Sequence, residues 1–383
     1  MPDSTPTVSA ASLPISDPAA RPEPTSGTAL CLSGGGYRAM LFHAGALIRL
    51  NETGLLRTLD RVSSVSGGSI TAAVLALAWR DLDFGPGGVA REFTDRVVTP
   101  LRAMAGRSID KKSVLTGVLL PGRTVAETVA KAYDRYLFHG ATLRSLPEDG
   151  AGPRFVINAT NVQTGKLFRF SRPYAGDWTV GLWRDPTIPL ADAVAASSAF
   201  PPVLSPHRIT PSGQFEAVPG GVNQAAAFRE SVWLSDGGVY DNLGLQTAWY
   251  RCRRLLVSDG GGKFDAEPAP GRDWARHGIR VLEIVDSQVR ALRKIQLISA
   301  YQRDLRDGAY WGLRTNPADY PLADPVAIAE ADVQRARTVP TGLSRLDEPT
   351  QRALINWGYA ITDTALRSRV DPTLAKPSRL PIS

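Results

Sequence analysis

The order of apolar and polar positions predicts that the folded part of the chain begins with a strand, a helix and a second strand. Residues Thr28–Ser33 form a short apolar run that three glycines interrupt, and Tyr37–Leu50 carries its apolar side chains at helical spacing. A second apolar run, Arg61–Val65, precedes an almost wholly apolar helical segment at Ser69–Arg80. This order is a βαβ unit, which implies parallel strands in a buried sheet with a right-handed crossover.

The rest of the pattern alternates short apolar runs with longer amphipathic ones. It predicts helices at Val89–Met104, Thr124–Phe138, Leu190–Ser198, Gln288–Asp307 and Glu348–Arg367. It predicts strands at Arg154–Ala159, Leu167–Ser171, Val232–Ser235, Leu255–Ser258 and Ile279–Val285, with the first two forming a hairpin. Residues 204–230 are rich in proline and glycine, so we expect a long loop there.

These elements predict one large α/β domain. No stretch between Thr28 and Arg369 has the composition of a linker, so we expect the domain to span residues 28–383, with a helical C-terminal part. Residues 1–27 are rich in Pro, Ser, Thr and Ala, which predicts a disordered tail, and they lack the basic start and apolar segment of a secretory signal. The longest apolar run, Ile70–Trp79, is shorter than the ~20 residues of a membrane span. We expect a cytoplasmic protein whose contact with membranes, where it makes one, is peripheral.

Composition and charge exclude some classes of function. The 383 residues are 43% hydrophobic and 21% charged, which is ordinary for a globular protein. The net charge is +7, but the 44 basic residues are scattered and form no dense stripe, so we expect no nucleic-acid site. A mildly basic surface suits an anionic membrane face, and it is equally compatible with a solvated surface that has no partner. The two cysteines, Cys31 and Cys252, have no spacing typical of zinc ligands or disulfides.

Ser66 lies where the second strand meets the next helix. A serine at a sharp strand-to-helix turn is exposed above the sheet, and Gly67 and Gly68 let the backbone bend there. The start of the helix adds the positive end of its dipole. Three further serines compete for this role: Ser63 and Ser64 lie in the strand and Ser69 lies in the helix. A helix cap without reactivity is an equally simple interpretation of this segment taken alone.

The first glycine run is a candidate anion site. Gly34, Gly35 and Gly36 precede a helix and can present successive N–H groups to the oxyanion of an acyl-transfer intermediate. Arg38 adds charge or braces the loop. The same glycines, with Ala39, also fit a dinucleotide fingerprint. That interpretation requires an acidic residue at the end of the second strand, where Ser66 stands instead.

The residue that activates Ser66 is harder to choose. A histidine is the usual base, but none of the four has a distinctive setting: His43, His139, His207 and His277. Asp236 and Asp259 each come after a strand and precede two glycines. The residues after Gly238 form an ordered run, whereas a Pro-rich loop comes after Gly261. Because a base needs a rigid position, the pattern favours Asp236.

Four segments in this order resemble the patatin-like phospholipase family: LCLSGGGYRAMLFHAGAL (residues 30–47), RVSSVSGGS (61–69), ASSAFPPVLSP (196–206) and LSDGGVYDNLGL (234–245). The resemblance covers about residues 28–245 and is weaker beyond them. It implies a three-layer α/β/α fold with a mostly parallel central sheet. The one departure from the usual Gly-x-Ser-x-Gly elbow is Ser64, which occupies the first glycine position.

The resemblance also implies a function and roles for particular residues. Ser66 corresponds to the nucleophile and Asp236 to the base of a Ser-Asp dyad. The implied oxyanion hole comprises Gly34, Gly35, Gly36 and Gly67, and the implied supporting residues are Arg38, Gly68, Gly237 and Gly238. The expected activity is hydrolysis of lipid carboxylic esters, with membrane phospholipid as the substrate and no metal or organic cofactor. A catalytically idle lipid-binding or scaffold protein on the same fold is the alternative.

Overall fold

The computed structural model describes residues 23–109, 125–212, 215–262, 264–271 and 273–383. Its helices are α1 (Gly36–Glu52), α2 (Gly67–Ala78), α3 (Thr99–Ala105), α5 (Val125–Tyr133), α6 (Leu190–Ser197), α7 (Gly238–Asp241), α8 (Leu245–Trp249), α9 (Trp274–Gln302), α10 (Glu330–Thr338) and α11 (Glu348–Arg369). Its strands are β1 (Thr28–Leu32), β2 (Arg61–Val65), β3 (Arg154–Asn161), β4 (Lys166–Ser171), β5 (Tyr174–Asp177), β6 (Gly181–Arg184), β7 (His207–Ile209), β8 (Phe215–Glu216), β9 (Val232–Asp236), β10 (Arg254–Asp259) and β11 (Asp307–Gly312).

The described strands form one sheet in the order β11-β10-β1-β2-β3-β4-β5-β6-β8. In addition, β9 pairs with β3, and β7 pairs with β9. The strands from β11 to β3 are parallel to their neighbours, and β4, β5, β6 and β8 extend the sheet with antiparallel pairs. The predicted βαβ unit is confirmed, because β1 and β2 are adjacent and parallel. The predicted hairpin is confirmed by the antiparallel pairing of β3 with β4.

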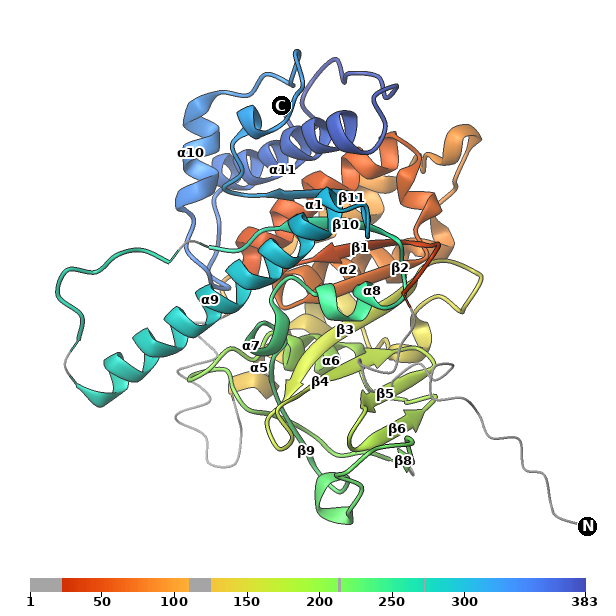
Figure 1. Ribbon diagram of the computed structural model, residues 1–383, viewed down its shortest axis with the longest axis vertical. Helices are drawn as coiled ribbons and strands as arrows, with labels where there is room; N and C mark the ends of the chain where they lie inside the picture. The colour runs from red at the N-terminus through yellow and green to blue at the C-terminus, as the bar shows by residue number, and fades with distance from the viewer. Residues whose placement is uncertain (1–22, 110–124, 213–214, 263, 272) are drawn as a thin grey trace, which may run out of the picture.

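Helices cover both faces of the parallel strands (Figure 1). Alternate side chains of a strand point to opposite faces, and this sorts β1 into two sets. Leu30 and Leu32 pack in the large core that includes α1, α2 and α11. Ala29 and Cys31 pack in a smaller core with side chains of α8 and α9. The predicted three-layer α/β/α fold with a helical C-terminal part is therefore confirmed.

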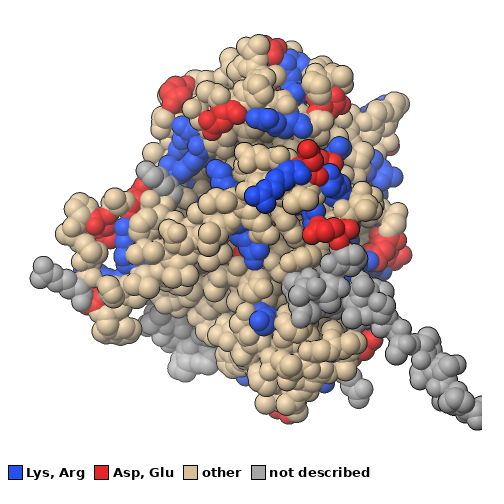
Figure 2. All heavy atoms as spheres, viewed as in Figure 1, with Lys and Arg blue, Asp and Glu red and all other residues tan. Residues whose placement is uncertain are grey.

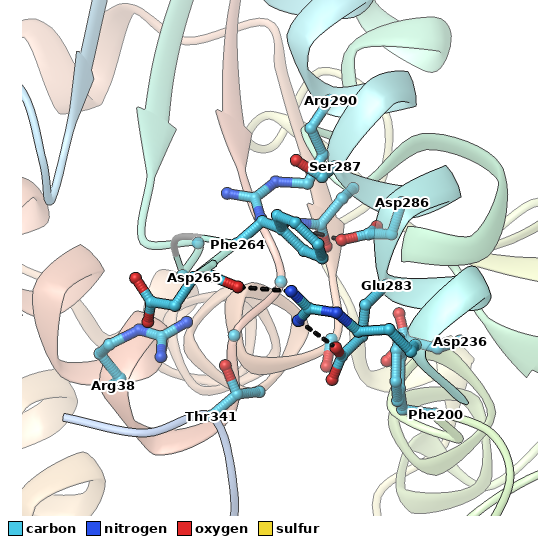
Figure 3. Close-up of a pocket in the computed structure, with 17 residues that line it drawn as sticks. Arg38, Phe200, Asp236, Phe264, Asp265, Glu283, Asp286, Ser287, Arg290 and Thr341 are labelled. Carbon is cyan, nitrogen blue, oxygen red and sulfur yellow. Dashed lines mark hydrogen bonds and ion pairs between the residues drawn. The ribbon is translucent and has the colours of Figure 1, made fainter. Parts of the chain in front are cut away.

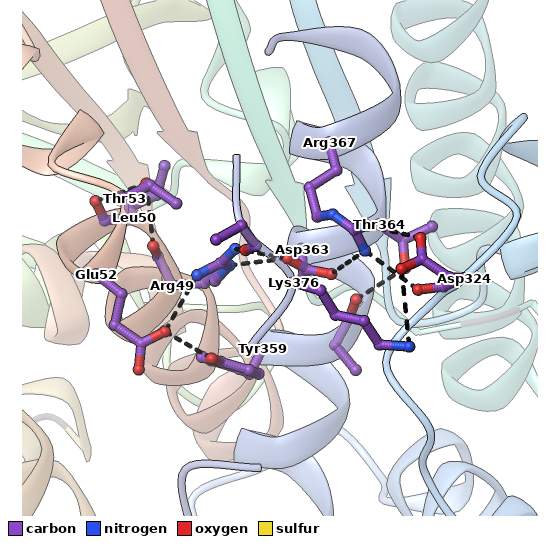
Figure 4. Close-up of polar contacts among 12 residues, drawn as sticks. Arg49, Leu50, Glu52, Thr53, Asp324, Tyr359, Asp363, Thr364, Arg367 and Lys376 are labelled. Carbon is purple, nitrogen blue, oxygen red and sulfur yellow. Dashed lines mark hydrogen bonds and ion pairs between the residues drawn. The ribbon is translucent and has the colours of Figure 1, made fainter. Parts of the chain in front are cut away.

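A buried polar cluster joins α11, the last helix, to α1 (Figure 4). The Arg49 guanidinium on α1 lies 2.8 Å from the fully buried Asp363 carboxylate on α11. Arg367 contacts the same carboxylate at 3.4 Å and the Asp324 carboxylate at 2.6 Å. Burial raises the pKa of Asp363, and the two guanidinium groups oppose that rise. Charge pairing thus adds to the apolar contact between the two helices.

The edge of β3 brings two distant parts of the chain together. β2 pairs with one edge of β3 as far as Val65, which lies opposite Asn158. β9 continues along the same edge from Asp236, which lies opposite Ala159, and runs in the reverse direction. The C-terminal ends of β2 and β9 therefore meet end to end, although about 170 residues separate them in sequence.

Several predicted elements need correction. Ile279–Val285 is not a strand but lies within α9, which begins after Asp273, whose carboxylate accepts the N–H of Arg276 at 2.9 Å. This run is rich in β-branched residues, which favour strands in general, but capping and tertiary contacts override that preference. The helix expected at Gln288–Asp307 is longer and lies earlier in the chain, because α9 runs from Trp274 to Gln302, and Asp307 starts β11.

Other expectations were partly right. The long loop expected at residues 204–230 contains β7 and β8. The helix expected from Val89 begins at Thr94, with a π-helical turn before α3. Thr124, the expected start of another helix, and residues 1–22 of the expected tail lie outside the described residues. The limits of the domain stay a prediction. In the described part of the chain, no helix combines the length and apolar content that crossing a bilayer requires.

Candidate active site

Ser66 lies at the sharp turn between β2 and α2, as the sequence predicts. Its backbone has φ 50° and ψ −120°, a positive-φ conformation outside the αL region that L-residues adopt rarely. The Ser66 N–H donates to the Ser197 hydroxyl at 2.9 Å, which holds the turn in place. Ser66 keeps 9% of its surface exposed and lines a cavity. Such strained turns occur at functional sites, where they aim one side chain.

The hydroxyl groups of the three competing serines form hydrogen bonds inside the protein. The Ser63 hydroxyl donates to the Gly244 carbonyl at 2.5 Å. The Ser69 hydroxyl donates to Ser64 at 3.0 Å, and Ser64 donates to a backbone carbonyl of β3. All three side chains are fully buried, so Ser66 is the serine of this segment that a substrate can reach.

Asp236 lies next to Ser66 because β9 ends where β2 ends. The two side chains line the same cavity, and the Ser66 hydroxyl is close enough to lower the pKa of the Asp236 carboxyl group. The Asp236 Oδ1 atom accepts the Gly238 N–H at 2.7 Å, and its backbone is held by bonds to Ala199 and Thr160. Burial raises the pKa of Asp236 to about 7, against the lowering effect of the Gly238 N–H and the Ser66 hydroxyl. A carboxyl group with this pKa can take up and release a proton near neutral pH.

Asp259, the alternative acid, has a different environment despite its identical Asp-Gly-Gly sequence. Its carboxylate accepts the Tyr310 hydroxyl at 2.8 Å and lies 3.8 Å from the Arg290 guanidinium. Burial raises the pKa of Asp259, but Arg290 and these hydrogen bonds outweigh burial and lower that pKa below its ordinary value. Asp259 is thus ionised at neutral pH and pairs with Arg290, whereas Asp236 lies beside Ser66.

The histidines do not contact Ser66 in the described structure. His43 is buried on α1, where its Nε2 atom lies 2.9 Å from the Ser33 carbonyl and its Nδ1 atom 2.8 Å from the Ser258 hydroxyl. Burial lowers the pKa of His43 to about 4, so the ring is neutral. His207 is buried against Asp192, and His277 lies exposed on α9. None of them lines the cavity that holds Ser66.

The glycine run places two helix N-termini beside Ser66. α1 begins at Gly36 and α2 at Gly67, and a Cβ atom on Gly67 would lie 2.2 Å from the Gly36 carbonyl oxygen. Only glycine allows the two ends to approach this closely. The Gly34 N–H donates to the Asn242 carbonyl at 3.1 Å, so it is already committed. Within the described ranges, no acceptor is found for the N–H groups of Gly35, Gly36 and Gly67.

The cavity has a volume of about 360 Å³, within the range of small-molecule sites. Figure 3 shows Arg38 on the side of the cavity opposite Asp236 and Phe200. Arg38 donates to the Gly260 carbonyl at 3.0 Å and to the Val339 carbonyl at 2.9 Å, so it braces two loops. Its Nη2 atom has no hydrogen-bond partner among the described residues, and burial lowers the pKa of Arg38 to about 10.

The remaining supporting glycines of the sequence analysis also lie at close approaches. Gly68 donates its N–H to the Ser33 carbonyl at 3.1 Å. A Cβ atom on Gly237 would lie 2.4 Å from the Asn158 carbonyl oxygen, and one on Gly238 would lie 3.0 Å from the Asp236 carboxylate. These positions leave no room for a side chain between β3 and the acid.

Sequence analysis missed Ser197, which holds the turn. Its hydroxyl accepts the Ser66 N–H, donates to the Asn158 carbonyl at 2.6 Å and lies 2.9 Å from the Ser69 hydroxyl. Ser197 ends α6, within the segment ASSAFPPVLSP. The resemblance singles out that segment, but no local pattern in it indicates a contact with Ser66.

Several solved structures are similar to this chain. Among solved structures, human GIVD cytosolic phospholipase A2 matches with a TM-score of 0.50 at 13% identity, over 88% of this chain and 61% of that chain. Its complex with methyl gamma-linolenyl fluorophosphonate inhibitor and terbium chloride has a TM-score of 0.49 at 15% identity, over 88% and 58%. VipD from Legionella pneumophila has a TM-score of 0.36 at 15% identity, over 92% and 69%. The first of these likenesses shows a shared fold.

The chain spans about three fifths of the length of the human enzyme. A search of curated protein sequences finds no match. The family model described as patatin-like phospholipase matches residues 30–249, more than half of the chain. Because this region runs from β1 to the end of α8 and includes both Ser66 and Asp236, the chain belongs to the patatin-like phospholipase family.

Proposed function

We propose that this protein hydrolyses the carboxylic esters of lipids, with Ser66 as the nucleophile and Asp236 as its base. The observation that carries the proposal is that the two side chains meet in one cavity, where the C-terminal ends of β2 and β9 come together. A serine in a strained turn contacts a buried carboxyl group whose pKa is about 7, between two helix N-termini. The family and the fold support a lipid acyl hydrolase, and the geometry supports these two residues as its dyad.

The proposed reaction proceeds through an acyl-enzyme. Asp236 accepts the hydroxyl proton of Ser66 while the Ser66 Oγ atom attacks the ester carbonyl carbon. The carbonyl oxygen becomes an oxyanion that the free N–H groups of Gly35, Gly36 and Gly67 stabilise. The intermediate then collapses, the C–O bond of the ester breaks, and the departing alcohol takes the proton from Asp236.

Water completes the cycle by the same route. Asp236 takes a proton from a water molecule, the resulting hydroxide attacks the acyl carbonyl, and the same N–H groups hold the second oxyanion. The Ser66 oxygen leaves with the proton that Asp236 returns, and a fatty acid is released. Each proton that Asp236 accepts is returned within the same half-reaction, so the reaction as proposed needs no metal or cofactor.

The lining of the cavity supports a phospholipid as substrate. Phe200 and Phe264 give it apolar surface, which suits an acyl chain. Arg38 supplies a cation with a free N–H group, which suits an anionic headgroup. Both kinds of surface lie within one cavity, so a molecule with a charged and an apolar part fits it best.

Covalent labelling tests the nucleophile. A fluorophosphonate probe should label the wild-type protein at Ser66 and should not label Ser66→Ala. Ser287→Ala is the matched control because Ser287 lines the same cavity from α9, and this variant should label as the wild type does. Labelling of Ser66→Ala, or no labelling of folded wild-type protein, would contradict the proposal. The second result would favour the catalytically idle lipid-binding protein.

A comparison of two acids tests the base. Asp236→Asn should lose hydrolysis of lipid esters, whereas folded Asp259→Asn protein should retain it. Circular dichroism checks folding in both cases. Full activity in Asp236→Asn would exclude Asp236 as the base.

A further inference from the structure

α9 carries its polar and apolar faces in the reverse of the usual order. In a surface helix the apolar face normally packs against the protein and the polar face meets solvent. In the first two thirds of α9, five polar side chains line the cavity beside Ser66: Arg280, Glu283, Asp286, Ser287 and Arg290. Figure 3 shows the last four of these around the cavity. Most of the large apolar side chains of this stretch are exposed instead of packed against the protein.

Polar contacts hold this helix to the rest of the protein. Arg290 lies 3.8 Å from Asp259, and Arg293 donates to the Gln246 side chain on α8 at 3.0 Å. Of the 29 residues of α9, only Leu297 and Ala300 are buried, and both lie in its last two turns. The body of the protein therefore fixes α9 by its C-terminal end and its polar face, which leaves the opposite face uncovered.

The uncovered face is a continuous apolar stripe along one side of the helix. We define the apolar stripe as Trp274, Val281, Ile284, Val285, Leu292 and Ile295. Their spacing of three, four and seven residues places them on one side of an α-helix. Trp274 is 88% exposed and Leu292 is 64% exposed, although burial is the normal state of such side chains. Figure 2 shows few charged side chains along α9 in the same view.

We propose that the apolar stripe of α9 docks onto an anionic lipid surface, with the helix lying in the headgroup region parallel to the bilayer. A helix with one strongly polar and one apolar face lies in the membrane interface, and α9 lacks the all-round apolar surface of a spanning helix. A terminal tryptophan is typical of this interface. The net charge of +7 complements anionic headgroups.

The position of the stripe connects docking to the cavity. Opposite faces of one helix line the cavity and contact the lipid, so docking brings the cavity within about one helix diameter, roughly 10 Å, of the surface. A lipid that leaves the bilayer then has a short path to Ser66. The choice of a lipid surface as the partner rests on the proposed function, but the test of docking does not require catalysis.

The test measures vesicle binding of the full chain with Ser66→Ala, so that lipid turnover plays no part. The probe is a vesicle of phosphatidylcholine and phosphatidylglycerol in equal parts, with pure phosphatidylcholine vesicles for comparison, and the assay is co-sedimentation. The stripe variant combines Val285→Asp with Leu292→Asp. The control variant combines Val162→Asp with Val222→Asp, which are 56% and 77% exposed and add the same charge away from α9.

The stripe variant should bind the mixed vesicles at least about a hundredfold more weakly, because each lost apolar insertion is worth about tenfold or more. The control variant should bind nearly as well as the parent, and the mixed vesicles should bind more protein than pure phosphatidylcholine. When the two stripe substitutions are made in the protein that retains Ser66, this variant should hydrolyse a water-soluble monomeric ester at the wild-type rate. That result would show that the stripe substitutions leave the active site intact.

Equal binding by the stripe and control variants would overturn the docking proposal. So would a parent protein that binds neither vesicle. Sedimentation without lipid tests whether a second copy of the chain binds the stripe instead. If the parent self-associates through the stripe and the stripe variant binds vesicles as well as the parent does, the apolar stripe is a contact between two copies of the chain. Hydrolysis of a soluble ester by the wild type and by Ser66→Ala is measured in a separate assay. A failure of docking therefore changes vesicle binding, whereas a failure of the proposed dyad changes ester hydrolysis.

Discussion

Replacing Asp236 with Asn should raise the stability of the folded protein at neutral and alkaline pH while it abolishes ester hydrolysis. The pKa of Asp236 is about 7 in the folded protein, above its ordinary value of 3.8. Between these two values the folded protein keeps a proton that the unfolded chain has released. The contribution of Asp236 to stability therefore falls as the pH rises from about 4 to about 7, and stays constant above that.

The size of the effect depends on the difference between the two pKa values. A difference of about 3 units, at about 1.36 kcal/mol per unit, corresponds to about 4 kcal/mol at alkaline pH. Between about pH 5 and about pH 8, the wild type should lose about 2.7 kcal/mol relative to the variant. Asn has no charge to bury and keeps an oxygen that can accept the Gly238 N–H, so its own contribution does not change with pH.

Urea unfolding of both proteins over this pH range measures the difference in the free energy of unfolding. Asp259→Asn is the control with the opposite sign. The pKa of Asp259 is lowered, so its carboxylate stabilises the protein above its unfolded pKa, and that stability is lost as the pH falls through the folded value. Its replacement should destabilise at neutral pH and leave Arg290 without its partner. A constant gap between wild type and Asp236→Asn across the pH range would refute the reasoning.

Three further predictions concern activity and packing. The kcat/KM for a soluble ester should rise with pH and level off above about 7, because Asp236 must be ionised to act as a base; a midpoint near 4 would contradict this. Gly67→Ala should lower activity and cost about 1–3 kcal/mol on urea unfolding, since its Cβ would lie 2.2 Å from a carbonyl oxygen, whereas Gly278→Ala, with no atom within 4 Å, should be tolerated. Asp363→Ala should cost up to about 3–5 kcal/mol because it removes the buried carboxylate that two buried guanidinium groups share, whereas Lys376→Ala should cost less than about 1 kcal/mol; similar losses in both would argue against the cluster.

Local sequence carries the elements in which neighbouring residues decide the structure. The helical spacing after Gly36 and the two glycines after Ser66 predict the βαβ unit and the turn, because strand, turn and helix are consecutive in the chain. The same reasoning fails for Ile279–Val285. Its β-branched residues favour a strand, but the segment lies inside one long helix that begins at the Asp273 cap and that contacts the protein further along through Arg290 and Arg293.

The choice between the two acids shows the same limit within the site. Asp236 and Asp259 are each succeeded by two glycines, so local pattern separates them only through the residues beyond those glycines. In the structure they differ because Arg290, on a helix distant in sequence, pairs with Asp259 and not with Asp236. The commitment of the Gly34 N–H to Asn242 depends likewise on a contact across about 200 residues. Tertiary contacts of this kind leave no local signal.

The shared edge of β3 makes the distance between the proposed nucleophile and base independent of the chain that connects them. Hydrogen bonds of adjacent residues, Asn158 and Ala159, set that distance. Insertions or deletions in the connecting segments should therefore alter which acyl chains are accepted without moving the reacting groups apart. A slip of β9 by a single residue on β3 would instead turn the carboxyl group to the opposite face of the sheet, so variation should be tolerated in the connections and excluded from this short stretch of strand.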